Sequence, residues 1–394
     1  MSDRDFGVRD HRDPSLNPGG ALEDVVVVDL SRALAGPHAA MMLGDLGARV
    51  IKVESPAGDD TRGWGPPFVD GVSTYFLSCN RNKESIALDL KSDDGRDTLA
   101  ALIRKADVLV ENFRPGVLER LGFSMEHLHE LNPRLVVLAI SGFGHDGPEG
   151  TRAGYDQIAQ GEAGLMSLTG PSADEPTRVG VPIGDLLAGM YGAYGVVAAL
   201  HERNRTDRGT VVRTSLLASI VGVHAFQGTS YTVAGEVPHA TGGHHPAICP
   251  YGLFHAADGA VQIAVGSESL WRRFAPAFGL DRPEWSTNSD RVGDRDAVIA
   301  AVDEAFGQHD SAELLAELDT IGIPAGKVRD LAEVYGWEQT RSQGLLIDVE
   351  HATLGRITLP GPPLRFDEGG RAGHDAPPVL DQHGPAIRAW LAED

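Results

Sequence analysis

The sequence predicts an α/β fold in which a large domain with a parallel sheet is joined to a smaller α+β domain. Val25-Val26-Val27-Val28 is an unbroken β-branched run, which is typical of a strand buried on both faces. Strand-like runs then alternate with helix-like segments as far as residue 141, which indicates a parallel sheet covered by helices. After residue 224 this alternation gives way to a hairpin pattern, so we expect a second domain there.

The chain begins with a polar, Pro/Gly-rich stretch, residues 1–22, which we interpret as a loose N-terminal arm. A βαβ unit follows, with strands expected at 25–28 and 49–54 and a helix at 38–46, where Pro37 suits the first turn. The unit ends in Glu54, as a dinucleotide-binding half would, but no GxGxxG separates strand and helix. A nicotinamide-dependent dehydrogenase is therefore weakly supported.

The remaining elements follow from periodicity and turn residues. We expect strands at 85–89, 108–111 and 135–141, and helices at 93–105, 117–121, 125–132, 156–167, 186–200, 267–278, 295–309 and 383–390. Residues 171–182 and 235–250 read as loops, and residues 211–220 are mixed. Residues 252–265 read as a hairpin turning at Asp258-Gly259. The Pro/Gly-rich tail, 360–378, is expected to form no elements.

The composition limits the kinds of partner that the protein is expected to bind. The chain has 394 residues with 34 Lys and Arg against 56 Asp and Glu, a net charge of −22, which argues against nucleic acid as a partner. We find no apolar run of the length that a bilayer span needs, and three of the first five residues are charged, so we expect a cytoplasmic protein without a membrane partner. Its two cysteines lie far apart and no HExxH or CxxC occurs, so no metal site is expected.

A net acidic protein must bind any anionic ligand through a local group of cations. Such a group occurs in the N-terminal half, partly in loops after expected strands, where open α/β sheets bind ligands. Its members are Lys52, Arg62, Arg81, Lys83, Lys91, Arg104, Lys105, Arg114 and Arg120. The alternative for each is a salt-bridged surface position.

Asp185 is the carboxylate that most needs an explanation. It lies in an otherwise uncharged, apolar run, Val181 to Met190, directly after Gly184. Because water solvates carboxylates strongly, an Asp in this setting must be partnered, protonated or used in chemistry. It is either a carboxylate nucleophile at a helix start or the N-cap of the helix expected at 186–200.

A set of motifs in fixed order resembles the class III CoA-transferases, the family of formyl-CoA transferase and carnitine CoA-transferase. They are DLSRALAGP at 29–37, LGDLGA at 43–48, VIKVE at 50–54, GDDTR at 58–62, NRNKESI at 80–86, DVLVENFRPG at 107–116, SGFG at 141–144, GYD at 154–156, GLM at 164–166 and GD at 184–185. TRGWGPPF at 61–68, NRNK at 80–83 and RAGYD at 152–156 are similar to the succinyl-CoA:glutarate CoA-transferase branch.

The resemblance implies a fold and a state of assembly. The large domain would be Rossmann-like and built from both chain ends, residues 23–224 and 331–394, with the small domain at 225–330. Two subunits would interlock as a homodimer. The partners would be an acyl-CoA and a carboxylic acid. No tightly bound cofactor and no metal would be needed, and coenzyme A would enter as part of the substrate.

The resemblance also implies site residues. The family's catalytic aspartate falls on Asp185, which would attack a thioester carbonyl, form a mixed anhydride and release CoA thiolate. With a reference pKa of about 3.9, an aspartate needs no separate base. The family's CoA contacts fall on Leu34, Ala35, Ser55, Leu88, Asp89, Leu90, Lys91, Asn112, Phe113, Arg114, Arg120, Ser141, Phe143 and Gly144. For Arg120, a charge that complements a helix C-terminus is the alternative.

Three further residues are substrate candidates. Arg32 would clamp the far carboxylate of a dicarboxylic acid, and its alternative is an ion pair with Asp29 or Asp45. Gly242 and Gly243, like the glycines at 142–144, would offer backbone N–H groups to an oxyanion, and an ordinary turn is their alternative.

Two rival functions stay open. A 2-methylacyl-CoA racemase of the same fold also has an Asp near position 185, but it needs a His and an Asp as its two bases. Its helix start reads Gly-His-Asp where this chain has GYD at 154–156, which favours transfer. A catalytically inactive CoA-binding protein would keep the cations and lose the nucleophile.

Overall fold

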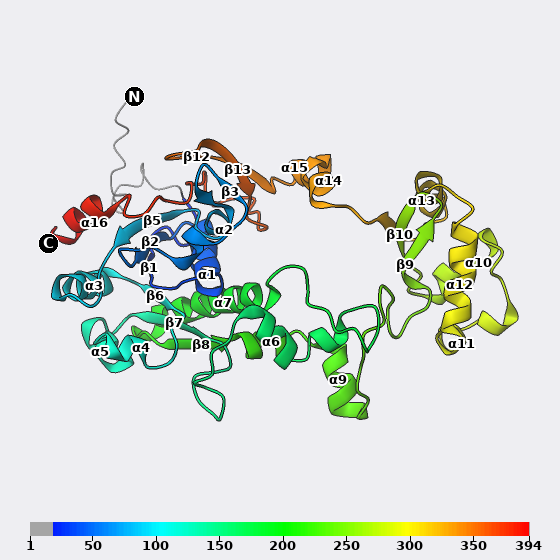
Figure 1. The fold of residues 1–394 in the computed structure, drawn as a ribbon, viewed down its shortest axis with the longest axis horizontal. Helices are drawn as coiled ribbons and strands as arrows, with labels where there is room; N and C mark the ends of the chain where they lie inside the picture. Colours follow the sequence, from blue (N-terminus) through cyan, green and yellow to red (C-terminus); the bar gives the residue numbers. More distant parts are fainter. Residues whose placement is uncertain (1–18, 394) are drawn as a thin grey trace. The chain divides into compact units, whose positions relative to one another are not determined.

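The structure is a computed structural model that describes residues 19–393, so residues 1–18 of the expected arm lie outside the described part (Figure 1). The chain forms two compact units. The larger comprises the described residues up to Leu165, Val179–Thr232, and the described residues from Gln339 onward. The smaller comprises Met166–Arg178 and Val233–Glu338. Each unit is described on its own.

The larger unit is built on a six-stranded parallel sheet, as predicted, in the order β5-β2-β1-β6-β7-β8. Its strands are β1 (Val26–Asp29), β2 (Arg49–Glu54), β5 (Lys83–Ala87), β6 (Val108–Glu111), β7 (Val136–Ser141) and β8 (Val211–Ser215). β1, β6 and β7 are continuous or nearly continuous apolar runs, and β2 is buried along its whole length, because helices cover the sheet on both faces.

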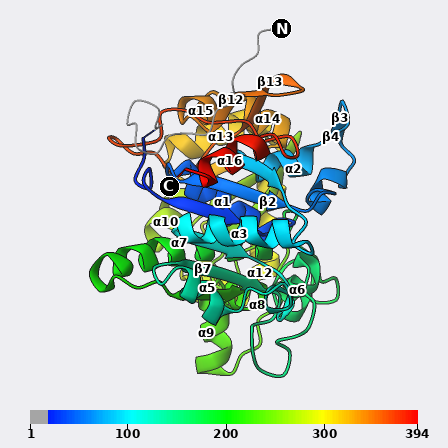
Figure 2. The same ribbon diagram turned by 90° about the vertical axis from the view of Figure 1, so that its left-hand side faces the viewer.

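Figure 1 shows α1 (Ala35–Asp45) and α7 (Ile183–Thr206) on one face of the sheet. The other face carries α3 (Asp93–Lys105), α5 (Met125–Leu131) and α16 (Gly384–Leu391), which lie toward the viewer in Figure 2. The remaining elements of this unit are η1 (Asp60–Gly63), β3 (Phe68–Val69), β4 (Val72–Ser73), α2 (Thr74–Ser78), α4 (Val117–Arg120), α6 (Asp156–Glu162), α8 (Leu216–Val221), α15 (Glu338–Ser342), β12 (Leu346–His351) and β13 (Gly355–Pro360), with α9 (Ala225–Ala234) at its boundary.

The strand order reverses between β1 and β6, because the chain adds β2 and β5 on one side of β1 and then returns to its other side. In open α/β sheets, ligands bind outside the carboxyl ends of the strands at such a switch point. Here the loops that follow are residues 30–34 after β1 and residues 112–116 after β6. Both loops belong to motifs that carry the family resemblance.

The smaller unit has its own core around a three-stranded antiparallel sheet, β9 (Tyr251–Ala256), β10 (Gly259–Ala264) and β11 (Ala325–Lys327). The predicted hairpin is confirmed, although its two-residue loop is Ala257-Asp258, one position earlier than expected. The helical elements of this unit are η2 (Met166–Leu168), α10 (Glu268–Ala277), η3 (Pro283–Trp285), α11 (Asn288–Gly293), α12 (Arg295–Phe306), α13 (Ser311–Thr320) and α14 (Leu331–Gly336).

By length and composition alone, α7 would be able to cross a membrane, although the sequence analysis predicted no membrane-spanning segment. Buried core helices pass the same test. Ala188, Ala193 and Val196 of α7 are buried in the core that α7 shares with α1 and the sheet. Packing within this unit therefore accounts for one part of the apolar surface of α7, while Met190, Tyr194 and Val197 of the same helix are exposed.

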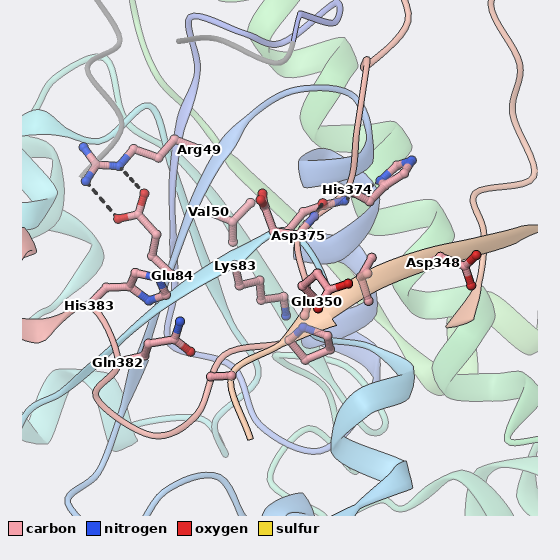
Figure 3. A pocket seen from close by; sticks show the side chains of 15 residues that line it. Arg49, Val50, Lys83, Glu84, Asp348, Glu350, His374, Asp375, Gln382 and His383 are labelled. Atoms are coloured by element: carbon pink, nitrogen blue, oxygen red, sulfur yellow. Dashed lines mark hydrogen bonds and ion pairs between the residues drawn. The ribbon is translucent and has the colours of Figure 1, made fainter. Parts of the chain in front are cut away.

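The C-terminal segment covers the outer edge of the sheet beside β5. Asp375 and His383 hydrogen-bond the edge through Asn82 and Ser85, the N–H of Asn82 donating to the Asp375 carbonyl at 3.1 Å. Between these two attachments lies a cavity of about 390 Å³ (Figure 3). The ion pair between Arg49 and Glu84 borders it. None of the predicted site residues lines this cavity, so it marks a covered sheet edge rather than the predicted site.

Candidate active site

Asp185 lies in a cavity of about 380 Å³ at the switch point of the sheet. The cavity brings together seven of the residues assigned by resemblance or charge, drawn from the loops after β1, β6 and β7. They are Arg32, Leu34, Ala35, Asn112, Phe113, Arg114 and Ser141. Gly142 lines it as well. The structure thus places the expected nucleophile beside about half of the expected CoA contacts.

A second cavity, of about 230 Å³, holds five more of the expected CoA contacts. They are Ser55, Leu88, Asp89, Leu90 and Lys91, which follow β2 and β5. Arg32 and Phe113 line both cavities, so the two cavities are neighbours. An elongated ligand that fills both cavities would pass next to these two side chains.

Asp185 is the third residue of α7, which begins at Ile183, so it does not cap this helix. The N-cap position falls on Pro182, which has no side chain that can accept a hydrogen bond. The interpretation of Asp185 as an N-cap is therefore wrong, because the helix starts three residues earlier than expected. Its side chain is left available for other work.

The electrostatic surroundings of Asp185 favour its neutral form. Burial, and then the negative charge of Asp156, raise the pKa of Asp185 to about 7. The reference pKa of about 3.9 therefore does not describe this carboxyl. Burial removes water from the carboxylate, and no cation in the described part of the chain pairs with Asp185 to compensate for this loss of solvation.

Asp156 is the partner that sequence reasoning did not assign. Its Oδ1 accepts hydrogen bonds from the N–H groups of Gly184, at 2.8 Å, and Asp185, at 3.3 Å. Its Oδ2 accepts from Nε2 of Gln160 at 2.7 Å. Its place in the GYD motif was the only available signal, because the two aspartates are 29 positions apart in the sequence and nothing local indicates their contact.

Seven of the nine cations singled out in the sequence fall into two groups. Four of them form ion pairs with buried or nearly buried carboxylates: Lys52 with Asp59, Arg62 with Glu54, Arg81 with Asp45, and Lys83 with Asp29. Lys91, Arg114 and Arg120 are exposed, and their charged groups have no ion-pair partner within residues 19–393. The first four are salt-bridged, but Lys52, Arg81 and Lys83 are buried and not on the surface as the alternative supposed. The last three remain available to phosphates.

Arg32 pairs with Asp60 at 3.2 Å, not with Asp29 or Asp45 as the structural alternative supposed. Both side chains are about half exposed, at 45% and 58%. Asn112 holds the backbone of Arg32 from both sides, since its Oδ1 accepts from the Arg32 N–H at 2.8 Å and its Nδ2 donates to the Arg32 carbonyl at 2.7 Å. The amide of Asn112 therefore shapes the cavity wall.

Some predicted residues line neither cavity. Arg120 ends α4, and its guanidinium lies near Gly116. Phe143 is buried beneath the guanidinium of Arg152, 4.6 Å from its ring centre, and the Gly144 N–H donates to Ser141 Oγ. Gly242 and Gly243 belong to the smaller unit, where Gly242 adopts a left-handed φ of 63° and its N–H donates to the Gly170 carbonyl. Their roles toward substrate stay predictions.

Four further side chains lie in or beside the cavity, and for the three aromatic ones the sequence left a pocket wall and the core open as alternatives. Trp64 and Tyr155 line the cavity, together with Arg152, and Tyr155 is 67% exposed. Tyr75 packs edge-on against Trp64, and burial and then the charge of Asp185 raise the pKa of its phenol. Single aromatic residues gave no periodic signal that would separate a cavity wall from the core.

These features define an α/β enzyme that carries a carboxylate in a cavity bordered by exposed arginines at the switch point of a parallel sheet. Comparison with known proteins specifies the class. The model of the family "CoA-transferase family III" matches residues 22–384. The chain therefore belongs to CoA-transferase family III, and it is a CoA-transferase, an enzyme that uses an acyl-CoA as substrate.

Individual relatives agree with this assignment. Over 367 residues the chain is 38% identical to a succinyl-CoA:glutarate CoA-transferase of Homo sapiens, covering 92% of this chain and 84% of that protein. It is 37% identical over 383 residues to an acetyl-CoA:oxalate CoA-transferase of Acetobacter aceti, covering 95% and 97%. A crystal structure of a CAIB/BAIF family protein from Brucella suis superimposes with a TM-score of 0.85 at 39% identity, covering 95% and 100%.

Proposed function

We propose that this enzyme moves CoA from a short acyl-CoA, such as succinyl-CoA, to a dicarboxylic acid, such as glutarate, through an acyl intermediate on Asp185. One observation carries the proposal: a largely buried carboxylate, with no cationic partner among the described residues, faces a cavity whose wall includes six of the expected CoA contacts. The relatives named above act on short-chain acyl donors and, in both cases, on a dicarboxylate.

The chemistry would proceed by four exchanges at one carboxylate. Asp185 attacks the thioester carbonyl, the C–S bond breaks, and the acyl group forms a mixed anhydride with Asp185 as CoA thiolate leaves. The thiolate attacks the aspartyl carbonyl of the anhydride, which frees the donor acid and leaves an aspartyl-CoA thioester. The acceptor carboxylate attacks this thioester, which releases CoA thiolate and forms a second mixed anhydride, now between the acceptor and Asp185. The thiolate then attacks the acceptor's carbonyl, which gives the new acyl-CoA and regenerates the Asp185 carboxylate.

Each attack creates an oxyanion that needs hydrogen-bond donors, and one such donor is typically worth about 3 kcal/mol. Gly142 lines the cavity with Asp185, so it remains a candidate among the predicted glycines. Because the pKa of Asp185 is about 7, only the ionised fraction attacks. The reaction would therefore start from the deprotonated enzyme.

The CoA moiety would extend from the cavity of Asp185 into the second cavity. Arg114 lies in the first cavity and Lys91 in the second, and each is exposed and unpaired within residues 19–393. Cations that no carboxylate neutralises can take phosphate oxygens without breaking an existing pair. This arrangement supports Lys91 and Arg114 as phosphate ligands, with Ser55, Leu88, Asp89 and Leu90 along the same wall.

The far carboxylate of the acceptor would bind Arg32. Its present partner, Asp60, is an exposed carboxylate, and exposed ion pairs contribute only about 0–1 kcal/mol. A substrate carboxylate could replace Asp60 at little cost. The rigid backbone of Arg32, held by Asn112, keeps the side chain at the mouth of the cavity.

The racemase alternative receives no support from the named relatives, which are CoA-transferases. At the position where a racemase has its histidine base, this chain has Tyr155. Deuterium exchange at the α-carbon of a 2-methylacyl-CoA, in the absence of an acceptor acid, would revive that alternative. The inactive CoA-binding alternative is disfavoured by the same comparisons.

The experiment that tests the proposal is a matrix of acyl-CoA donors and acceptor acids, read by mass spectrometry of the CoA products. We expect the highest rates with succinyl-CoA and dicarboxylates of about five carbons, and no transfer by Asp185→Ala. Equal rates for monocarboxylates would contradict the dicarboxylate assignment, and full activity of Asp185→Ala would contradict the mechanism.

We further propose, from the family resemblance, that the enzyme is an interlocked homodimer. Large apolar side chains are exposed on α7 and α9, among them Tyr194 at 74% and Tyr231 at 59%, which a monomer rarely leaves in water. Light scattering should give twice the 41.9 kDa chain mass. The cytoplasmic location and the absence of nucleic-acid or membrane partners stay predictions.

A further inference from the structure

Helix α7, which carries Asp185, has no cap of its own. The first N–H groups of any helix lack partners within the helix and need an outside acceptor, usually a side chain at the N-cap. Here Pro182 occupies that position and contributes no side-chain acceptor. The intrahelical pattern begins only with the Leu186 N–H, which donates to the Pro182 carbonyl at 3.1 Å. The two N–H groups before it, on Gly184 and Asp185, face outward.

Asp156, the first residue of α6, supplies the missing acceptor. Its Oδ1 accepts from the Gly184 N–H at 2.8 Å and from the Asp185 N–H at 3.3 Å. A Cβ added at Gly184 would lie 3.1 Å from the same oxygen and 3.0 Å from Ile220 Cδ1. Gly184 therefore allows Asp156 to approach closely, which gives a physical reason for the Gly-Asp pair.

The carboxylate of Asp156 is itself held in place from behind. Its Oδ2 accepts from Gln160 Nε2 at 2.7 Å, and Gln160 Oε1 accepts from the Val179 N–H at 2.9 Å. Gln160 is completely buried. A continuous chain of hydrogen bonds thus runs from the segment that precedes α7, through α6, to the backbone of Asp185. Every member lies in the larger unit.

We propose that Asp156 is a positioning residue: its carboxylate caps α7 from a neighbouring helix and so fixes the direction in which the Asp185 side chain enters the cavity. This inference rests on the proposed role of Asp185 as the attacking carboxylate. An attacking group must be held close to the reactive geometry, and a misplacement of about 1 Å can lower the rate by about 10²-fold. Asp156 does not touch the thioester in this scheme.

The position of Asp156 also has a cost. A second carboxylate beside Asp185 disfavours the ionised form that attacks, so geometry and charge act on the rate in opposite directions. The charged or titratable side chains around Asp185 are Asp156 on α6, Tyr75 on α2, and Arg32, Asp60, Arg114, Arg152 and Tyr155 in the cavity wall. Of these, Asp156 is the one whose charge raises the pKa of Asp185.

The hydrogen-bond chain offers a pair of substitutions that separates geometry from charge. In Asp156→Asn the side-chain oxygen can still accept from the α7 amides, but its NH₂ then meets the Gln160 NH₂, donor against donor. Adding Gln160→Glu restores every bond, because a carboxylate at 160 accepts both from the new NH₂ and from the Val179 N–H. The double variant keeps the geometry and moves the negative charge one side chain further from Asp185.

The experiment compares Asp156→Ala, Asp156→Asn and Asp156→Asn/Gln160→Glu with the wild type by steady-state kinetics, with active sites counted from the single equivalent of donor acid released when acyl-CoA is added without an acceptor. We expect Asp156→Ala to lower kcat per active site about 10–100-fold with little change in the KM for acyl-CoA. The double variant should recover kcat to within about threefold of wild type, and the acidic limb of its pH profile should move to lower pH.

Ser124→Ala is the matched control, because Ser124 caps α5 through the His127 N–H and lines neither site cavity. It removes a comparable cap and should leave kcat unchanged. If Asp156→Ala keeps kcat within twofold, or if the double variant is no better than Asp156→Asn, the inference is overturned. If Asp156→Ala does not fold, the comparison of the single Asn variant with the double variant decides. Full activity of Asp185→Ala, measured in parallel, would instead overturn the proposed function.

Discussion

Replacing Asp185 by asparagine is expected to stabilise the protein at neutral pH while it abolishes turnover. Folding raises the pKa of this carboxyl from 3.8 to about 7, because burial and the charge of Asp156 penalise the ionised form. Between about pH 4 and pH 7 the folded protein therefore binds more protons at Asp185 than the unfolded chain does. The contribution of Asp185 to the free energy of unfolding is therefore most favourable at low pH and becomes less favourable as the pH rises through that window.

The size of the effect follows from the shift. At about 1.4 kcal/mol for each pKa unit, the interval from 3.8 to about 7 sets a ceiling of about 4 kcal/mol. Since the side chain is only partly buried and water screens it, we expect about 1–3 kcal/mol above pH 7 and almost nothing near pH 4. Asparagine has nearly the same shape and is neutral at every pH, so it avoids this cost.

The assay is urea unfolding of wild type and Asp185→Asn from about pH 4 to pH 8, followed by a signal from the larger unit. Asp97→Asn serves as the control, because Asp97 is an exposed carboxylate on α3 for which no interaction is recorded among the described residues. It should change stability little at any pH. An Asp185→Asn protein that is less stable than wild type at pH 8, or whose advantage does not grow with pH, would refute the reasoning.

Three further predictions concern charges. Lys83→Met should lower the free energy of unfolding by about 3–5 kcal/mol, because it leaves the buried carboxylate of Asp29 unpaired, and Asp29→Leu/Lys83→Met should regain most of the loss; a fully stable single variant would contradict this. Lys91→Ala and Arg114→Ala should each raise the KM for acyl-CoA about tenfold, less at high salt, whereas Arg104→Ala, which removes an exposed arginine outside both cavities, should not; equal effects in all three would count against the phosphate assignment. Arg32→Ala should raise the KM for a dicarboxylate far more than for a monocarboxylate, and equal changes would exclude the clamp.

Much of the larger unit could be predicted because its strands are short, apolar and regularly spaced. The bounds expected for β2, α3 and β6 agree with the structure, since each is delimited by turn residues or charges. Residues 211–220 were mixed because β8 passes directly into α8 at Ser215, with no loop between them. The hairpin of β12 and β13 was missed, although apolar residues alternate in both strands.

The site was less accessible to prediction for a different reason. Motifs identified Asp185 and the loops after β1 and β6, because local sequence determines both. The sequence could not show which cations are neutralised, since the partners of Lys52 and Lys83 depend on how strands pack side by side. The contact between Asp156 and the start of α7 depends on tertiary structure in the same way.

The most direct test is to trap the acyl group on the enzyme. Wild-type protein is mixed with succinyl-CoA and quenched with hydroxylamine, and the peptide that contains Asp185 is examined by mass spectrometry. We expect a hydroxamate at this side chain, formed only when an acyl-CoA is present and lost in Asp185→Asn. Unmodified Asp185 during active turnover, or a hydroxamate on another carboxylate, would contradict attack by this residue.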